Sequence, residues 1–391
     1  MANVSSSNGL EKRPKLRFPG FDEPWERKTL SRLSKIVKGE QLPSTDVNPE
    51  GLFYHLNGGV NPSSRTDKFN VDANTISISE GGNSCGYVNW NPKPFFSGGH
   101  NYTLQEIVEE VSPYFLYEAL KSKQTEIMAL RVGSGLPNIQ KKDIEKFSLY
   151  IPSKKEQNHI ADFLKLVDSK TEEQSLLIDN LKKYKRGAVR CLLSAKSCPL
   201  RNARWTTAKM GELGRFVKGA PLSKADISED GTPFILYGEL YTTYNEVVTS
   251  VKRRTQAQVD DTFLSRVGDV VIPTSGETPE EISTASCVML PDVILAGDLN
   301  IFRGDKVDGR IMSYLLNHVV NGKIARIAQG KSVVHIQANE LCKLTLTYPD
   351  KNTQNTIIGF LSLLDDKIMN EENSLAFLSA LKEGLLQQLF I

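Results

Sequence analysis

The sequence predicts an α+β protein built from two similar domains and two long helices with coiled-coil patterning, related by an internal repeat. Three observations predict this. One long segment occurs twice, a shorter match opens each unit, and strand-like runs alternate with turn residues between the matches. A repeat of this length indicates two units of one architecture in a single polypeptide.

The duplicated segment runs from Gly135 to Ser194. Shifted by 197 positions, it lies without a gap on Ser332 to Ile391. A second match, at an offset of 180, begins at Trp25 and Trp205 and includes a repeated Val-Lys-Gly triplet. The identical pairs of the longer match include Ile139 with Ile336, Pro152 with Pro349, Gln157 with Gln354, Phe163 with Phe360, Asp168 with Asp365 and Gly187 with Gly384.

These matches divide the chain into six segments. The two units diverge in sequence within residues 40–134 of the first and 220–331 of the second. Gly98 with Gly297 and Asn101 with Asn300 still correspond there. We therefore expect domains that share a fold and differ in surface. The predicted segments are a tail at 1–24, a first domain at 25–150, a long helix at 151–194, a linker at 195–204, a second domain at 205–348 and a second long helix at 349–391.

Within each domain a shorter helix is predicted ahead of the duplicated segment. It covers Pro113 to Lys123 in the first domain and Arg310 to Asn321 in the second. In this alignment Tyr117 corresponds to Tyr314.

Each copy of the duplicated segment contains a strand-like run, a proline and a long helix. The runs are Phe147 to Ile151 and Leu344 to Tyr348. Proline disfavours helix in the residue before it, so each helix begins just after the proline. Ser153 with Glu156 has the spacing of a capping box, and Asp350 is an N-cap candidate.

Apolar residues then recur every seven positions, which is the pattern of a coiled coil. At about 1.5 Å per residue each helix would be roughly 60 Å long, so we expect the helices to pack on each other or on another protein. The alternative is that each helix covers only its own domain. Polar residues such as Lys185 and Lys382 interrupt the pattern. The predicted packing positions are Ile160, Leu164, Val167, Ile178, Leu181, Leu192, Ile357, Leu361, Leu364, Ile368, Leu375, Leu378, Leu385 and Leu389, with Ala188 on the same track.

Composition excludes several classes of protein. No run of about 18 apolar residues is present, and the polar N-terminus lacks the apolar core of a signal peptide, so we expect a cytoplasmic protein. The five cysteines are scattered and never form a C-x-x-C pair, which favours reduced thiols over zinc ligands or disulfides. A net charge of +2 means that a DNA-binding face requires a local concentration of Lys and Arg.

The sequence lacks the common motifs for nucleotide phosphates and catalytic zinc. It contains no G-x-x-x-x-G-K-[ST] phosphate loop and no H-E-x-x-H zinc motif. The stretch from Asn91 to Phe95 is similar to the N-P-P-[YF] of adenine methyltransferases, but Lys93 breaks it, and we interpret it as a turn. A methyltransferase or nuclease acting alone is therefore disfavoured.

The layout resembles the specificity subunit of type I restriction-modification systems. The resemblance rests on PKLRFPGFDEPWERKTLSRL at the front, IP-x-x-x-EQ-x-x-IADFL in the first copy and a shortened tail after the second. It implies two target recognition domains, each reading one half of a split DNA site, and two long antiparallel helices that separate them. It also implies partners, namely double-stranded DNA, methyltransferase subunits that dock on the helices, and restriction subunits.

The same resemblance implies that S-adenosylmethionine, ATP and Mg²⁺ bind to partner subunits and that this chain has no catalytic, cofactor or metal site. The second copy departs from the pattern, with Thr353 in place of Glu156 and Ile358-Gly359 in place of Ala161-Asp162. These departures concern the affinity of the second helix face for a partner subunit.

Base readout requires basic or amide side chains at groove edges, while other basic groups hold phosphates. Five basic residues of the first long helix are further candidates for phosphate contact, and the alternative is that they form a solvated face. They are Lys182, Lys183, Lys185, Arg186 and Arg190. A scaffold or adaptor without a DNA function is the competing hypothesis. The candidates in the domains are Lys38, Arg65, Lys68, Lys93, His100 and Arg131 in the first, and Lys218, Lys224, Lys252, Arg253, Arg254, Arg303, Arg326 and Lys331 in the second.

Overall fold

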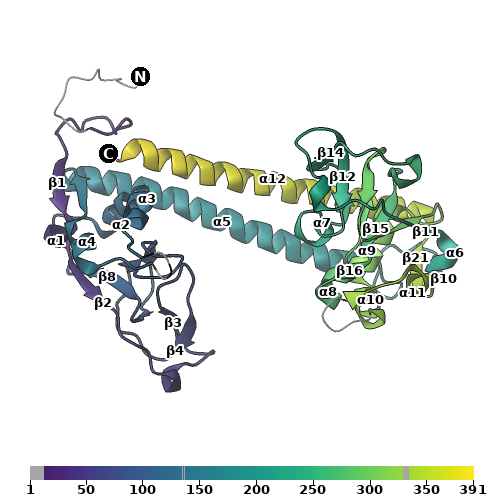
Figure 1. The fold of residues 1–391 in the computed structure, drawn as a ribbon, viewed down its shortest axis with the longest axis horizontal. Coiled ribbons are helices and arrows are strands. Elements are labelled where there is room, and N and C mark those ends of the chain that lie inside the picture. Colours follow the sequence, from purple (N-terminus) through teal and green to yellow (C-terminus); the bar gives the residue numbers. More distant parts are fainter. Residues whose placement is uncertain (1–12, 134, 136, 329–333) are drawn as a thin grey trace. The chain divides into compact units, whose positions relative to one another are not determined.

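The computed structural model describes residues 13–133, 135, 137–328 and 334–391. The chain divides into two compact units. Unit 1 comprises Met1–Ser175 and Asn373–Ile391, and unit 2 comprises Leu176–Glu372. Each unit therefore combines one mixed domain with a segment of both long helices, α5 (Lys154–Leu192) and α12 (Lys351–Leu389), which Figure 1 shows in teal and yellow.

A two-stranded antiparallel sheet closes each domain where the chain enters and leaves it. In unit 1, β1 (Glu26–Thr29) pairs with β9 (Ser148–Ile151). In unit 2, β10 (Trp205–Lys209) pairs with β21 (Thr345–Pro349). The two segments of sequence repeat thus meet in space in both units, and each long helix begins directly after this closing sheet. The strands predicted before the prolines are confirmed.

The remaining strands of unit 1 form two sheets. The larger has the order β2-β8-β5-β6, and the smaller has the order β4-β3-β7, in which β3 is antiparallel to β4 and parallel to β7. The strands are β2 (Lys35–Lys38), β3 (Phe53–Leu56), β4 (Ser64–Thr66), β5 (Thr75–Ser79), β6 (Val88–Asn91), β7 (Phe96–Ser97) and β8 (Asn101–Gln105). The helices are α1 (Leu30–Leu33), η1 (Ser44–Asp46), α2 (Pro113–Ser122), α3 (Gln124–Ala129) and α4 (Lys141–Lys146).

Unit 2 repeats these two sheets, adds one strand to the larger sheet and contains a further two-stranded pair. Its larger sheet has the order β11-β19-β15-β17-β13, its smaller sheet has the order β14-β12-β18, and β16 pairs with β20. The strands are β11 (Arg215–Lys218), β12 (Thr232–Leu236), β13 (Val247–Val248), β14 (Arg253–Thr255), β15 (Asp269–Pro273), β16 (Ser275–Gly276), β17 (Ser286–Val288), β18 (Ile294–Ala296), β19 (Leu299–Arg303) and β20 (Val334–His335). The helices are α6 (Met210–Leu213), η2 (Lys224–Asp226), α7 (Glu239–Thr242), η3 (Asp261–Phe263), α8 (Pro279–Ile282), α9 (Gly309–His318), α10 (Asn321–Ile327) and α11 (Ala338–Cys342).

Both long helices contain 39 residues and begin where predicted. Asp350 caps α12, because its carboxylate accepts the backbone N–H groups of Asn352 at 3.1 Å and Thr353 at 3.2 Å. Glu156, in the first turn of α5, instead receives the guanidinium of Arg17 through both carboxylate oxygens, at 2.7 and 2.8 Å. No helix in the part of the chain that the structure describes is long and apolar enough to span a membrane.

The predicted packing positions of the long helices are all buried or half-buried. In unit 1, Ile160 and Leu164 of α5 share the core with Leu389 of α12. In unit 2, Ile357 and Leu361 of α12 pack in one core with the last turns of α5. There the prediction was one residue out of phase, because Val189 and Leu193 are the fully buried residues, and Ala188 and Leu192 lie half-buried beside them.

Candidate nucleic-acid interface

The edge strands of the two smaller sheets carry arginines in equivalent positions. Arg65 of β4 and Arg254 of β14 each precede a buried threonine, Thr66 or Thr255. Each arginine donates to the backbone carbonyl of a glycine, Arg65 Nε to Gly51 at 2.7 Å and Arg254 Nη1 to Gly231 at 2.8 Å. Because these bonds anchor the base of both guanidinium groups on an exposed strand, the two domains present the same charge from the same place.

A second equivalent pair ends the first strand of each larger sheet. Lys38 of β2 forms an ion pair of 2.6 Å with Glu80, and Lys218 of β11 donates to the Asn300 amide oxygen at 3.0 Å. The glycine that follows each lysine is required by close packing. A Cβ at Gly39 would lie 2.2 Å from the Gly98 carbonyl oxygen, where only glycine fits. The repeated Val-Lys-Gly triplet therefore has a structural role.

Glu80 connects two of the predicted residues in unit 1. Its carboxylate lies 2.6 Å from Lys38 Nζ and 3.6 Å from His100 Nδ1, and it accepts the Tyr102 hydroxyl at 2.9 Å. Burial alone would raise the pKa of Glu80, but the bonds from Lys38 and Tyr102 hold it below its ordinary value. Lys38 and His100 remain more than half exposed. The cluster thus fixes two polar side chains at one surface while leaving their outer faces accessible.

The other candidates in unit 1 are exposed but scattered. Lys68 pairs with Asp46 at 2.9 Å. Lys93 lies in the turn between β6 and β7, as predicted, and Arg131 follows α3. Both are exposed, and among the described residues neither has a salt bridge. Among the predicted DNA contacts of this domain, these two side chains therefore have the least to lose by contacting phosphate.

In unit 2 the triplet predicted as a DNA contact lies on and next to the edge strand β14. Arg253 is held by an ion pair of 2.7 Å with Glu239, and Lys252 is exposed with no salt bridge among the described residues. Beside Arg253 lies an open hollow of about 680 Å³, also lined by Lys224, Tyr237 and Tyr241. This hollow places cations and aromatic rings together, which suits phosphate and base contacts at one surface.

Arg303 does not belong with these residues. Its side chain is only 9% exposed and forms an ion pair of 3.1 Å with buried Asp269. The guanidinium also donates to the backbone carbonyls of Thr262 and Leu264. It therefore stabilises the larger sheet from within, and it is withdrawn from the DNA candidates. Arg326 is exposed on α10, while Lys331 lies outside the described residues.

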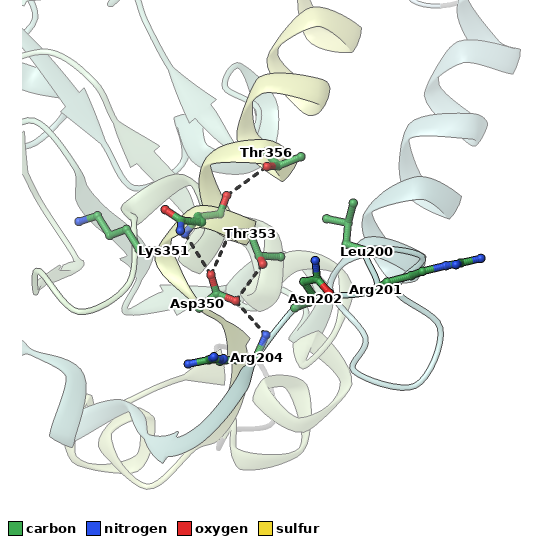
Figure 2. Close-up of a pocket in the computed structure, with 10 residues that line it drawn as sticks. Leu200, Arg201, Asn202, Arg204, Asp350, Lys351, Thr353 and Thr356 are labelled. Carbon is green, nitrogen blue, oxygen red and sulfur yellow. Dashed lines mark hydrogen bonds between the residues drawn. The ribbon is translucent and has the colours of Figure 1, made fainter.

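A polar pocket of about 730 Å³ lies where the linker meets the start of α12 (Figure 2). Arg201, Arg204 and Lys351 line it, which suggests an anion site. However, Asp350 already satisfies the helix start and accepts the Arg204 backbone N–H at 2.8 Å. These N–H bonds lower the pKa of Asp350 to about 2. A fixed carboxylate at this end of the helix disfavours a second anion.

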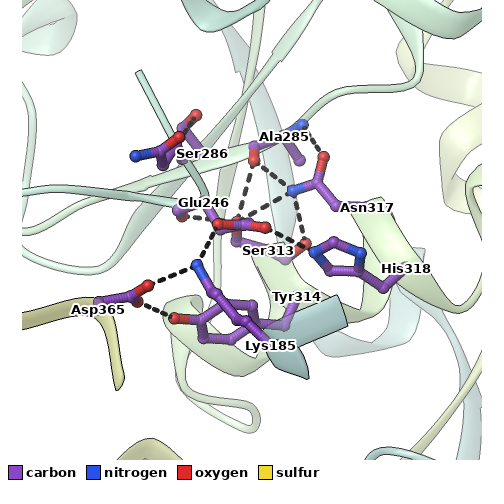
Figure 3. Close-up of polar contacts among 10 residues, drawn as sticks. Lys185, Glu246, Ala285, Ser286, Ser313, Tyr314, Asn317, His318 and Asp365 are labelled. Carbon is purple, nitrogen blue, oxygen red and sulfur yellow. Dashed lines mark hydrogen bonds and ion pairs between the residues drawn. The ribbon is translucent and has the colours of Figure 1, made fainter. Parts of the chain in front are cut away.

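A densely bonded polar cluster of unit 2 lies against the helices and was not predicted (Figure 3). Lys185 of α5 is 10% exposed and forms ion pairs of 2.6 Å with Asp365 of α12 and 2.7 Å with Glu246. Asp365 also accepts the Tyr314 hydroxyl at 2.7 Å, and Glu246 lies 2.5 Å from His318 Nε2. Burial would raise the pKa of Glu246, but His318 and Lys185 lower it to about 2. All members of the cluster therefore have partners.

Unit 1 contains the corresponding cluster at the repeat-related positions. Lys382 of α12 forms ion pairs of 2.6 Å with Asp168 of α5 and 3.0 Å with Glu118 of α2. Asp168 also accepts the hydroxyl of Tyr114. Glu118 is fully buried, and this burial raises its pKa to about 7 despite the nearby lysine. In each unit, a lysine of one long helix is thus bonded to an aspartate of the other.

These clusters correct the predicted match of Tyr117 with Tyr314. The N–H of Ser112, before α2, donates to Gln157, and the N–H of Asp308, before α9, donates to Gln354. Counted from these equivalent bonds, Tyr314 corresponds to Glu118, one residue further along. A signal for the clusters was present in the sequence, because Lys185 with Lys382 and Asp168 with Asp365 repeat at the same offset within an apolar pattern.

Comparison with known proteins yields consistent matches. A family model described as the type I restriction modification DNA specificity domain matches residues 22–182. A Mycoplasma genitalium protein named as a type I specificity subunit is 35% identical over 223 residues, covering 55% of this chain and 58% of that protein. A Mycoplasma pneumoniae protein with a similar name is 36% identical over 168 residues, covering 42% and 44%. The chain thus spans about half the length of these two relatives.

Solved structures extend the match to nearly the whole chain. The crystal structure of the type I restriction-modification S subunit from M. genitalium has a TM-score of 0.67 at 26% identity, covering 97% of this chain and 99% of that chain. A structure from work on complex assembly of the type I system has a TM-score of 0.55 at 14% identity, covering 96% and 98%. At that identity the second likeness shows the fold alone.

Proposed function

The chain belongs to the family of type I restriction-modification specificity subunits, and from this premise we propose that it recognises a two-part DNA sequence without itself performing chemistry. The observation that carries the proposal is the repeated domain. Two copies of one fold present arginines from equivalent edge strands, Arg65 and Arg254, while the exposed residues around them differ. Such an arrangement suits two readers that each recognise a different half-site.

In this proposal the exposed cations contact phosphates. The polar side chains that are fixed by an ion pair with a buried glutamate contact the bases. Lys93 and Arg131 in unit 1 correspond in role to Lys224 and Lys252 in unit 2. Lys38 with His100 and the hollow beside Arg253 are the surfaces that would approach base edges. Because phosphate contacts dominate affinity, binding should weaken steeply as salt concentration rises.

The long helices serve two further roles in the proposal. They set the distance between the two readers, and they bind methyltransferase subunits, through which restriction subunits join. S-adenosylmethionine, ATP and Mg²⁺ would bind to those partner subunits. The complex would then methylate adenine within one bipartite sequence.

The test is to purify the chain alone and together with its methyltransferase partner, and to sequence DNA methylation after incubation with each. We expect no methyl transfer by the single chain and methylation of one bipartite sequence by the complex. Methyl transfer by the single chain, or a complex that forms without affecting DNA methylation, would contradict the proposal. The second outcome would favour a scaffold or adaptor without a DNA function.

A further inference from the structure

An apolar groove in unit 2 is open, while the repeat-related groove in unit 1 is filled by the chain itself. The open groove has a volume of about 510 Å³. It lies on α5 near its C-terminal end and is bordered by α12 and by the linker. Its lining residues are Tyr184, Gly187, Ala188, Cys191, Leu192, Pro199 and Phe360.

In unit 1 an aromatic ring of the N-terminal segment covers the corresponding surface. Phe18 packs edge-on against Phe163 of α5, with ring centroids 5.7 Å apart, and both join the core together with Leu385 of α12. The backbone N–H of Leu16 donates to the Gln388 carbonyl at 2.9 Å and holds the segment on the helix. Phe163 is consequently half-buried.

The repeat explains why the groove of unit 2 stays open. At the offset of 180 that relates the front of the two units, Phe18 corresponds to Cys198, which is too small to replace a phenyl ring. Phe360, the counterpart of Phe163, is 41% exposed, and Tyr184 is 59% exposed. Apolar surface of this kind, concentrated on one helix face, is typical of an interaction site.

The helix stripes beside the two grooves carry different charges. In unit 1, the residue before Phe18 is Arg17, which pairs with Glu156, and the neighbouring stripe of α12 carries Glu383. In unit 2 the residues at the positions of Ala380, Glu383 and Gln387 are Lys183, Arg186 and Arg190. They form the stripe next to the groove on α5, because residues three and four apart share a helix face. All three are exposed, and among the described residues none has a salt bridge.

We propose that this groove binds a segment of the methyltransferase subunit that carries an aromatic side chain next to acidic residues. The aromatic ring would take the place that Phe18 takes in unit 1, and the acidic groups would pair with Lys183, Arg186 and Arg190. The inference rests on the proposed function and adds to it a specific surface. It also makes the two partner faces unequal, because within residues 13–133, 135, 137–328 and 334–391 the groove of unit 2 is open and that of unit 1 is covered by Phe18.

The experiment measures binding of purified methyltransferase subunit to the full chain by titration. The variant Cys198→Phe supplies the missing ring from within the chain, and the double variant Arg186→Glu, Arg190→Glu reverses the charge of the stripe. Lys142→Glu, an exposed lysine of α4 without a salt bridge in the described chain, is the matched control for charge. Thermal unfolding of each variant checks that it folds as the unchanged protein does.

We expect both groove variants to weaken binding by at least tenfold while unfolding normally, and the control to bind as the unchanged chain does. Unchanged binding by both variants would overturn the inference and leave the proposed function intact. Failure of the unchanged chain to bind methyltransferase would instead contradict the proposed function. If the unchanged chain forms dimers that Cys198→Phe abolishes, the occupant is a second copy, and the inference is wrong.

Discussion

Each of the two helix clusters contains a lysine paired with an aspartate at repeat-related positions, and a glutamate that also pairs with that lysine. The pKa of this glutamate is shifted in opposite directions in the two units. In unit 1, Glu118 shares Lys382 with Asp168, and burial raises the pKa of Glu118 to about 7. In unit 2, Glu246 has His318 as well as Lys185, and its pKa falls to about 2 despite burial. Burial would raise the pKa of both carboxylates, and the side-chain hydrogen bond from His318 to Glu246, which Glu118 lacks, therefore accompanies the opposite direction of the two pKa shifts.

The comparison also shows which contacts the two clusters share and which differ. Lys185 with Asp365 and Lys382 with Asp168 join the two helices at repeat-related positions, whereas the second carboxylate comes from α2 in one unit and from the segment before β13 in the other. A buried ionic contact between helices favours one register over others, since a shifted register leaves charges unpaired. The helix-to-helix pair is thus the common element, and its surroundings vary with the domain.

Removing the lysine should have the largest effect, and it should be greater in unit 2. Lys185→Met leaves Glu246 and Asp365, whose side chains are 16% and 34% exposed, without their lysine. Breaking a fully buried pair costs about 3–5 kcal/mol, which sets the upper bound. Lys382→Met should cost less, because Glu118 can take up a proton near neutral pH. Denaturant unfolding of the two variants measures both values. Equal losses would mean that the different states of the carboxylates have no energetic consequence.

The pH dependence should separate the two units. The folded pKa of Glu118 lies above that of an unfolded glutamate, so its contribution is fully present below pH 4.5 and is lost as the pH rises to about 7. For Glu246 the contribution is present above pH 4.5 and is lost as the pH falls toward 2. Each shift corresponds to about 3 kcal/mol.

Hydrogen exchange of peptides from α2 and α9, followed across this pH range, measures the two responses locally. Protection of α2 should decrease between pH 4.5 and 7, and Glu118→Gln should remove that decrease. A decrease that persists in the variant would assign it to another group.

The role of the helices as a spacer can be tested by lengthening them. Four residues inserted into both helices, near Gln174 and Glu371, add about 6 Å at 1.5 Å per residue. At about 3.4 Å per base pair this is roughly two base pairs, or one if the accompanying rotation of about 40° limits the fit. Methylome sequencing should find unchanged half-sites with a longer spacer. An active variant with an unaltered spacer would show that the helices do not set the distance.

Single exposed cations should have the smallest effects, and these should be alike in the two units. Lys93→Ala and Lys252→Ala each remove one side chain without a salt bridge among the described residues. Each should therefore make the negative slope of log affinity against log salt shallower by about 0.9. The control Lys142→Ala should leave the slope unchanged. DNA titrations at several salt concentrations measure these slopes, and an unchanged slope removes that lysine from the interface.

Local sequence patterns were sufficient to predict the strands before the prolines, the cap at Asp350 and the apolar tracks of both helices. These features depend on neighbours in sequence. By contrast, the equivalence of Arg65 and Arg254 was hidden, because these arginines follow Gly51 and Gly231 by 14 and 23 positions. Insertions in the intervening loops conceal a correspondence that the strand register reveals.

The misassignment of Arg303 has a different cause. An arginine at the end of a strand has the same sequence signature whether it faces solvent or pairs with a buried aspartate, and only the fold places Asp269 beside it. Likewise Lys185 and Lys382 were interpreted as interruptions of a seam. They prove to be its polar contacts, because two carboxylates from distant segments surround each of them.

The central claim is that each domain specifies one half of the DNA site. The most direct measurement replaces residues 220–331 with the equivalent region of a relative and sequences DNA methylation produced by the complex. The account predicts that one half-site changes while the other half-site and the spacer persist, because the domain of unit 1 and both helices are unaltered. A change in both half-sites, or in neither, would contradict it.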